Sequence, residues 1–576
     1  MKKRLPLPSP PCRALRLSAL LALLVPLWAR AQFSTSPTAP SFVCNAPGNQ
    51  QGVQAWADGA GGAYVLWIDK RGGSSGGSAL YFQRLNAAGN PLLGTNGRRL
   101  FQTQGREIWG MRAVSWRGGL LVAWVQGAFG VGGDSVRCQY FDPAGAPQWA
   151  QPALIAQSTP PSVIYESEIG LNVIPSDAGA TITHHLALGG GASRFTFNQV
   201  SLTGAVRWAN NSNQFVLSLP NGWPTNSYRT LADGSGGFYV VASSGGITTY
   251  LLAQRFNQDG APWPADVLVA SAGPDGRGGN TDWRLVRDPA GNLYVVWSSA
   301  SDKILACKVV ATGALGWPAP GYLNLGTNPS RQFYPAALWQ NNALWVIWND
   351  NRAPATFQYQ YAQQVSAAGT LAWPAAGVLV SDLDGNYRDP KLAAADNGAA
   401  MAFYVTGYTG LRSFRAQKIR PDATLAFPAT GVALLETSDS AGDLPADDDY
   451  VPVSQPNGAV QVYWASFNLG RDANILAARV QTSGSLLSTT ERVAAALGFA
   501  VYPNPTAAEL RLRYPAAGPA PTGLRLYDAP GRLVRSFAAP GPDGALSLRG
   551  LAPGLYVLRA ELAGQPVSCR VVVAPE

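Results

Sequence analysis

The chain has 576 residues, of which 47% are hydrophobic, 10% aromatic and only 13% charged. This composition supplies a large apolar core and excludes a wholly disordered protein. Its 63 glycines, 44 prolines and 18 tryptophans favour strands joined by tight turns over solvated helices. The length suits three or four average domains, or one large repeat assembly with additions.

The formal net charge of +9 is unevenly distributed along the chain. Residues 1–31 contribute +6, and residues 498–576 contribute +3 from eight arginines and five acids, which leaves residues 32–497 with no net charge. A strongly basic protein invites a nucleic-acid interpretation. The neutral middle of this chain argues against nucleic acid as a partner.

Residues 1–31 have the layout of a secretory signal peptide. Basic residues precede an apolar run of twelve, and the small residues Ala29 and Ala31 follow at the −3 and −1 positions of an expected cleavage site. Twelve residues rise only about 18 Å as a helix, too little for a hydrocarbon core of about 30 Å. We expect a mature chain that begins near Gln32, has no transmembrane segment and lies outside the inner membrane.

The four cysteines that follow the signal lie far apart and form no C-x-x-C pair. They are Cys44, Cys138, Cys307 and Cys569. This spacing supports neither a zinc nor a redox site, and a chain with so large a core does not need disulfide staples. We expect mostly buried free thiols, no metal site and no cofactor.

The middle of the chain repeats with a period of about 56 residues, marked by two landmarks in constant phase. The first landmark is a strand-like run that follows small turn residues. Its eight copies begin at Gly62, Gly119, Gly179, Gly237, Asn292, Ala343, Gly398 and Gly458. The second landmark is a turn about 20 residues later, at Gly89, Gly145, Gly204, Gly260, Gly313, Gly369, Ala423 and Gly484.

Other residues recur around these landmarks. Six residues before the turn stand Gln83, Gln139, Asn198, Gln254, Cys307, Gln363, Gln417 and Ala478, and shortly after it stand Trp149, Trp208, Trp263, Trp317, Trp373 and Phe427. Aspartates precede the first landmark at Asp58, Asp177, Asp233, Asp288 and Asp396. We expect the aromatic residue to cover the sheet of the next repeat, the glutamine to satisfy a backbone group between repeats, and the aspartate to hold a hairpin turn. Aromatic sugar platforms and a glutamine ligand set are the functional alternatives.

Four short strands per repeat with a recurrent aromatic residue are typical of β-propeller blades. We predict an all-β protein with an eight-bladed propeller over residues 50–497; seven blades are the alternative, since the repeat around His184 is the most divergent. Residues 32–49 form a linker that can add a ring-closing strand near Ser41. The Asp-x-x-Gly-x-x-x-Trp pattern resembles the tryptophan-docking repeat of quinoprotein-type eight-bladed propellers, but the adjacent cysteine pair of that family is absent.

Residues 498–576 depart from the repeat and predict a small Ig-like β-sandwich. The pattern runs from Tyr502-Pro503-Asn504-Pro505, through the Asp528-x-x-Gly531-Arg532 turn and the Leu-x-Pro553-Gly554-x-Tyr556 strand, to a basic and valine-rich end at Arg570. This set resembles the type A C-terminal sorting domain of the type IX secretion system found in the Bacteroidota. Arg570 stands where lysine is commoner in that family.

The resemblance implies that the secretion machinery is a partner and that the chain crosses the outer membrane. It also implies removal of the sorting domain and then release or attachment at the cell surface.

Candidates for catalysis are few in the middle region. His184 and His185 are the only histidines, and as neighbours on a strand they point to opposite faces. Two acidic stretches, residues 382–386 and 447–449, hint at calcium, but a plain turn is the better interpretation. Trp67-Ile-Asp-Lys-Arg71 and Trp348-Asn-Asp-Asn-Arg352 place an aspartate and an arginine just after a strand, as surface ion pairs or as part of a binding face.

These observations predict a secreted or surface-delivered propeller that binds a glycan or a protein, with no catalytic residue and no metal site. The alternative is an extracellular carbohydrate-active hydrolase or lyase with its site in the central funnel. Carboxylate-pair catalysis needs two acids held about 5–9 Å apart, and no such pair stands out. Whether the protein is an enzyme is therefore left uncertain, with the weight against it.

Overall fold

The computed structural model describes residues 33–34, 37, 40–72, 77–103, 105–127, 133–159, 163–165, 171–187, 193–209, 214–215, 225–244, 250–270, 283–299, 301–352, 358–385, 390–407, 412–437, 443–466, 472–484, 497–516, 518–528, 533–563 and 565–574. Residues 1–32, which include Ala29 and Ala31, lie outside the described residues.

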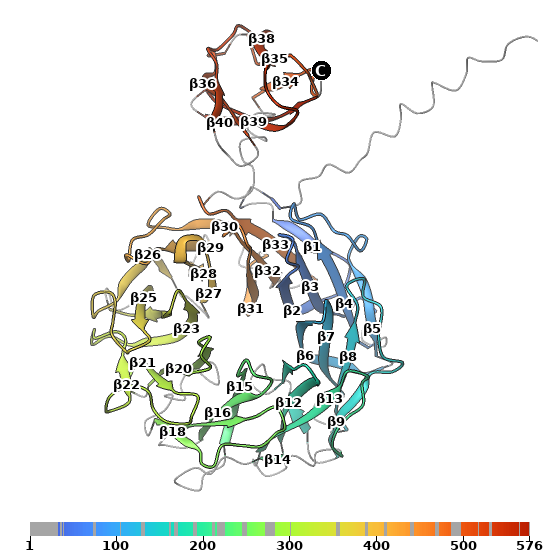
Figure 1. The fold of residues 1–576 in the computed structure, drawn as a ribbon, viewed down its shortest axis with the longest axis vertical. Coiled ribbons are helices and arrows are strands. Elements are labelled where there is room, and N and C mark those ends of the chain that lie inside the picture. The colour runs from blue at the N-terminus through green and yellow to red at the C-terminus, as the bar shows by residue number, and fades with distance from the viewer. Residues whose placement is uncertain are drawn as a thin grey trace, which may run out of the picture.

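The described part of residues 41–480 forms eight antiparallel sheets arranged around an axis (Figure 1). The first four, from the innermost strand outwards, are β2 (Gln50–Ala57), β3 (Ala63–Asp69), β4 (Ala79–Leu85), β5 (Arg98–Gln102); β6 (Glu107–Trp116), β7 (Gly119–Gly127), β8 (Ser135–Phe141), β9 (Ala153–Gln157); β10 (Val163–Tyr165) with β11 (Asn172–Pro175), β12 (Gly179–Ala187), β13 (Ser193–Ser201), β14 (Gln214–Phe215); and β15 (Thr225–Ala232), β16 (Phe238–Ser244), β17 (Leu251–Phe256), β18 (Val267–Ala270).

The remaining four sheets follow in chain order. They are β19 (Trp283–Arg287), β20 (Leu293–Ser298), β21 (Ile304–Val309), β22 (Tyr322–Asn324); β23 (Gln332–Gln340), β24 (Ala343–Asp350), β25 (Gln358–Ser366), β26 (Val378–Gly385); β27 (Lys391–Ala394), β28 (Ala400–Thr406), β29 (Arg412–Ile419), β30 (Val432–Thr437); and β31 (Pro445–Ser454), β32 (Val460–Ser466), β33 (Ile475–Val480), β1 (Ser41–Cys44). The only helical element assigned in the described residues is a 3₁₀ turn at Asp396–Gly398.

The ring is closed by strands from both ends of the repeat region. The first described strand, β1, pairs with β33, with Ser41 opposite Ala477. The innermost strands contact one another in sequence around the axis, and β2 contacts β31 to complete the circle. The expected closing strand near Ser41 is therefore confirmed. The fold is all-β and propeller-like.

The hydrophobic core lies between adjacent sheets. Every residue of β7, β24 and β32 is buried, as expected for a second strand that is covered on both faces. One buried cluster joins Trp345 and Ile347 of one sheet to Ala402 and Ile419 of the next. The first landmark of each repeat therefore encodes the strand on which two neighbouring sheets meet.

The recurrent tryptophan docks onto the following sheet, as predicted. The Trp149 indole Nε1 donates to the Leu202 carbonyl at 2.9 Å, and a Cβ added at Gly204 would lie 2.8 Å from the ring. Trp317 packs in the same way against Gly369 of the next sheet. Gly204 and Gly369 are required for two reasons, because their φ is positive and because the tryptophan ring leaves no room for a side chain.

The recurrent glutamine acts mainly within its own sheet, which corrects the expectation that it bridges repeats. Gln139 Nε2 donates to the Trp149 carbonyl at 3.1 Å, and its Oε1 accepts from the Trp149 amide at 3.3 Å. Gln363 does the same with Trp373. Asn198 alone of these adds a bond to another sheet, at the Ile155 carbonyl. The glutamine thus fixes the loop that presents the tryptophan.

The C-terminal region is a separate two-sheet sandwich. One sheet contains β34 (Ala500–Tyr502), β35 (Glu509–Arg513) and β38 (Gly544–Ser547). The other contains β37 (Leu533–Ser536), β36 (Thr522–Asp528), β39 (Gly554–Leu562) and β40 (Gln565–Val573). Leu510, Leu526 and Leu558 are among the buried residues between them. In the described part of the chain, no helix is long and apolar enough to cross a membrane.

Candidate functional site

The turn aspartates of the repeats stabilise the hairpin turns in which they lie. Asp233 accepts from the backbone amides of Ser235 and Gly237 and pairs with Arg255 at 2.8 Å. Burial acts to raise the pKa of Asp233, but the Ser235 amide and the Arg255 guanidinium outweigh it and hold the pKa below its usual range. Asp58 makes equivalent bonds to its own turn and to Arg84. The hairpin interpretation is confirmed for Asp58 and Asp233.

The two Trp-x-Asp-x-Arg segments form buried ion pairs, which corrects their expected place on the surface. Asp69 ends strand β3 with its side chain fully buried, accepts from the Trp67 indole at 2.9 Å and pairs with Arg71 at 2.7 Å. Asp350 repeats this arrangement in β24 with Trp348 and Arg352. Each arginine also lies over a tyrosine ring, Arg71 at 3.9 Å from the centroid of Tyr81. Each cluster holds the end of the second strand of its own sheet in place.

Both histidines are buried in β12. His185 makes an edge contact with the Tyr228 ring at 5.3 Å between centroids, and burial lowers the pKa of His185 to about 4. The imidazole is therefore neutral at physiological pH. Within the described residues, no group of three or more histidine, cysteine or acidic side chains is placed to hold a metal ion.

The two acidic stretches lie in strands, so the plain-turn interpretation is wrong for both. Residues 382–385 belong to β26, and residues 447–449 belong to β31. Asp449 accepts from the backbone amides of Gly52 and Val53 at 2.7 and 2.8 Å, which ties β31 to the start of β2. The side chains of Asp382, Asp384, Asp447 and Asp448 lie outside the described residues.

The innermost strands carry a set of polar residues that sequence reasoning missed, three arginines and one asparagine. Arg112, Asn172, Arg229 and Arg284 lie on the innermost strands β6, β11, β15 and β19. Their cross-strand partners are Ala123, Thr183, Val241 and Val296, each the fifth residue of its landmark run. The four side chains therefore start from the same rung of four consecutive sheets. The sequence could have revealed these residues only through their register with the landmark run, because the inner strands share no motif.

The sorting-signal residues meet at the paired ends of the C-terminal strands. The Asn504 amide oxygen accepts from the Val572 amide at 2.8 Å, and Tyr502 OH donates to Asp543 at 2.6 Å. Tyr502-Pro503 and Asn504-Pro505 are both cis peptide bonds. The opening Tyr-Pro-Asn-Pro segment is thus joined to the valine-rich end of the chain.

The other motif residues lie on β36, β39 and β40. Asp528 is opposite Tyr556, whose hydroxyl donates to the Ala552 carbonyl at 2.8 Å, and Gly554, after Pro553, is opposite Val573. Arg570 is opposite Val557 in β40, although its side chain lies outside the described residues, as do Gly531 and Arg532. The structure therefore gathers the beginning, the middle strand and the end of the motif in one domain.

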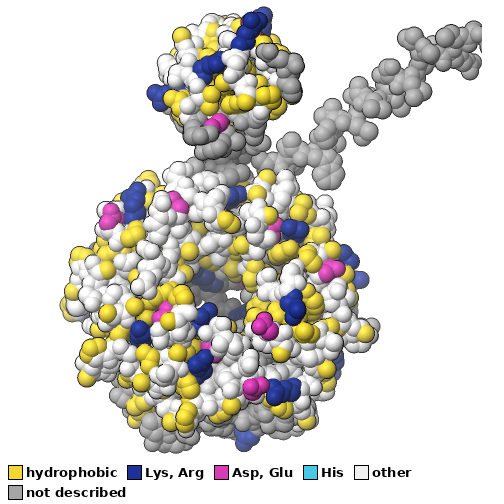
Figure 2. Space-filling model, in the orientation of Figure 1, with side chains coloured by type: hydrophobic (Ala, Val, Ile, Leu, Met, Phe, Trp, Pro, Cys, Tyr) yellow, Lys and Arg dark blue, Asp and Glu magenta, His cyan; other side chains and the backbone are white. Residues whose placement is uncertain are grey.

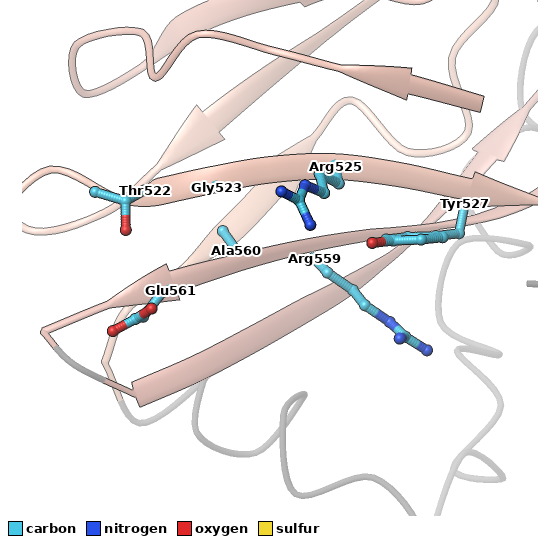
Figure 3. Close-up of a pocket in the computed structure, with 7 residues that line it drawn as sticks. All are labelled: Thr522, Gly523, Arg525, Tyr527, Arg559, Ala560 and Glu561. Carbon is cyan, nitrogen blue, oxygen red and sulfur yellow. The ribbon is translucent and has the colours of Figure 1, made fainter. Parts of the chain in front are cut away.

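An open pocket of about 560 Å³ lies on the β36–β39 face of this domain (Figure 3). Arg525 and Arg559 are directly opposite each other on the two strands, and the Arg559 guanidinium lies 5.0 Å from the centre of the Tyr527 ring. Glu561 is the one acid among the lining residues. The pocket is cationic and able to receive an acidic group.

Comparisons with known proteins give different results for the propeller-like region and for the C-terminal domain. The model of the secretion system C-terminal sorting domain matches residues 500–574. No curated protein matches the chain in sequence.

Similar solved structures include three proteins of different kinds. The WD40 domain of SCAP from fission yeast is 8% identical, with a TM-score of 0.38 over 75% of this chain and 92% of that chain. The polysaccharide lyase Uly1 is 9% identical, with a TM-score of 0.37 over 64% and 89%. The neuraminidase-like N10 protein of an influenza A virus from a little yellow-shouldered bat is 11% identical, with a TM-score of 0.32 over 57% and 98%. Residues 500–574 are a type IX secretion C-terminal sorting domain, which directs this protein to the cell surface or into the medium.

Proposed function

We propose that this protein is a surface-delivered recognition module whose propeller binds an extracellular glycan or protein. In this proposal residues 1–31 are a signal peptide cleaved after Ala31, residues 32–49 are the linker, and residues 50–497 form eight blades. Residues 498–576 are the sorting domain, which engages the secretion machinery and is then removed.

One observation carries the choice of binding over catalysis. Three buried acids of the propeller are engaged by the fold: Asp69 and Asp350 each hold an arginine and an indole, and Asp233 holds a turn and Arg255. The Ser235 amide and the Arg255 guanidinium hold the pKa of Asp233 below its usual range, so this acid is a poor proton donor near neutral pH.

The test uses the chain without its signal peptide, residues 32–576, on a panel of polysaccharides and surface proteins. Retention of a ligand without change in its length or reducing ends is the expected result. Release of products that stops on substitution of one aspartate or glutamate in the channel would instead establish the hydrolase or lyase function.

A further inference from the structure

The larger sheet of the sorting domain, β37-β36-β39-β40, has one face in the core and one face exposed. Side chains alternate between the two faces along each strand. Leu526 and Leu558 are fully buried, whereas Arg525 and Arg559 point to the opposite side and are exposed. We call this side, with Arg525, Tyr527 and Arg559, the outer face; the pocket in Figure 3 lies on it.

Two positive charges stand directly opposite each other on the outer face. Arg525 and Arg559 are cross-strand partners, and like charges at such positions destabilise a sheet. The Arg559 guanidinium lies 5.0 Å from the centre of the Tyr527 ring, a contact that attracts the cation but leaves its charge in place. In the part of the chain that the structure describes, neither guanidinium forms an ion pair or a hydrogen bond. The pair therefore lacks a counter-charge.

Other arginines of the same domain do have partners. Arg513 pairs with Asp543 at 3.6 Å. Arg535 donates to the Ser547 and Arg549 carbonyls at 2.8 and 3.0 Å. These arginines contribute to the fold of the domain. The opposed pair on the outer face costs the domain stability and contributes no bond to it.

The described acids of the domain do not supply the missing charge. Glu561 lies at the other end of the pocket from Tyr527 and forms no ion pair among the described residues (Figure 3). Asp528 alternates to the inner side of β36, and Glu509 is on β35 in the smaller sheet. Glu576 lies outside the described residues, three positions beyond the end of β40. The counter-charge for the pair must then come from another molecule.

Apolar side chains flank the arginines on the neighbouring strands. Leu533 of β37 is opposite Tyr527 and is 54% exposed, and Val572 of β40 is 38% exposed. Arginine and tyrosine beside exposed aliphatic groups are typical of the energetic centre of a protein–protein interface. Small ligands, in contrast, bind in clefts that enclose most of their surface. The open outer face is therefore better suited to the surface of another protein.

We propose that the outer face is the surface through which an acidic region of an export-machinery protein holds the sorting domain, with its carboxylates on Arg525 and Arg559. This inference rests on the proposed engagement of the machinery by residues 498–576, and adds the contact surface and the chemistry of the partner. A guanidinium pairs with a carboxylate through two parallel N–H bonds. Binding also removes the repulsion between the two arginines, so the complex gains what the free domain loses.

The first test follows export of the full chain, residues 1–576, in a bacterium that has a type IX secretion system. It compares the parent with R525Q/R559Q, with R525K/R559K and with a control. The control R511Q/R549Q removes the same charge from exposed arginines on β35 and after β38. Immunoblots of the periplasm, the cell surface and the medium measure the exported fraction. Thermal unfolding of residues 32–576 checks that each form is folded.

We expect R525Q/R559Q to lower the exported fraction at least about fivefold and the control to change it less than about twofold. The lysine variant keeps the charge but not the paired N–H bonds, and should export more than the glutamine variant. R525Q/R559Q should unfold at the parent's temperature or above, because it removes a repulsion and no buried contact. Normal export of folded R525Q/R559Q, or an equal loss in the control, would overturn the inference.

The second test distinguishes an acidic protein from an anionic lipid surface. The probes for purified residues 32–576 are polyglutamate and vesicles that contain phosphatidylglycerol. We expect polyglutamate to bind at low salt, at least about tenfold more weakly to R525Q/R559Q and within about twofold to the control. Arginine-dependent binding to the vesicles alone would identify a lipid surface and overturn the choice of a protein partner. Binding of neither probe would also overturn the inference.

A chain that ends at residue 497 separates this inference from the proposed function. If that chain stays in the periplasm and R525Q/R559Q is exported normally, the sorting domain still directs export and only the role of the outer face is lost. If the shortened chain is exported as well as the parent, the proposed engagement of the machinery by residues 498–576 fails, and the inference fails with it.

Discussion

The turns of the propeller and the wall of its channel are built from similar residues but use them differently. At the turns, Asp233 and Arg255 neutralise each other, and the same aspartate recurs in other repeats. On the inner strands, Arg112 and Arg284 each donate to the carbonyl of the preceding residue, and the residue at their rung differs among the eight sheets. In a repeat protein, recurrent residues join the repeats, and residues that differ between repeats are available for a ligand.

The largest expected effect is at a recurrent position. Trp149→Ala removes a buried indole, its bond to Leu202 and its contact with Gly204. We expect the free energy of unfolding to fall by about 3–5 kcal/mol, because a cavity opens between two sheets. Urea denaturation measures the change. Leu154→Ala, at a residue 41% exposed, is the control and should change stability by less than about 0.5 kcal/mol. A small loss for Trp149→Ala would contradict the docking role.

The next effect depends on pH. Burial lowers the pKa of His185 to about 4, so the unfolded chain binds this proton more readily between pH 4 and about 6.5. Stability should therefore fall as the pH drops through this window, by up to about 3 kcal/mol. His185→Gln removes the titrating group, and its urea midpoint should depend less on pH than that of the parent. Identical pH profiles for the two proteins would show that His185 does not contribute.

Smaller effects of opposite sign are expected at one recurrent turn position. Gly369→Ala places a Cβ 2.9 Å from the Trp317 ring at a φ of 89°, and should destabilise the protein by about 1–2 kcal/mol. Ala423 already occupies the equivalent turn with a φ of 70°, so Ala423→Gly should stabilise it by less than about 1 kcal/mol. Thermal unfolding compares the two variants with the parent. Destabilisation by both would mean that Ala423 is accommodated without strain.

The strongest local patterns predicted the most about the fold. The eight landmark runs coincide with the second strands, because a strand covered on both faces needs a continuous apolar run. The turn glycines and the closing strand near Ser41 were also predicted correctly, and the four sorting motifs were sufficient to identify the C-terminal domain. Each of these features is set by a few adjacent residues.

Long-range pairing could not be predicted in the same way. The glutamine stands at a spacing that reaches either its own sheet or the next, and only the structure shows that Gln139 holds Trp149. The acidic stretch before Tyr450 lies in a strand because Asp449 is fixed by the amides of a segment almost 400 residues away. The arginines of the inner strands align only through cross-strand register, and an irregular inner strand conceals that register in the sequence.

The most direct measurement records urea unfolding of Trp149→Ala together with its retention of the polysaccharides and surface proteins that the parent chain binds. We predict that Trp149→Ala loses about 3–5 kcal/mol of stability yet retains the same ligands as the parent once it is folded at low temperature. Unchanged stability, or loss of ligand retention in the folded variant, would contradict the separation between residues that join the repeats and residues that bind.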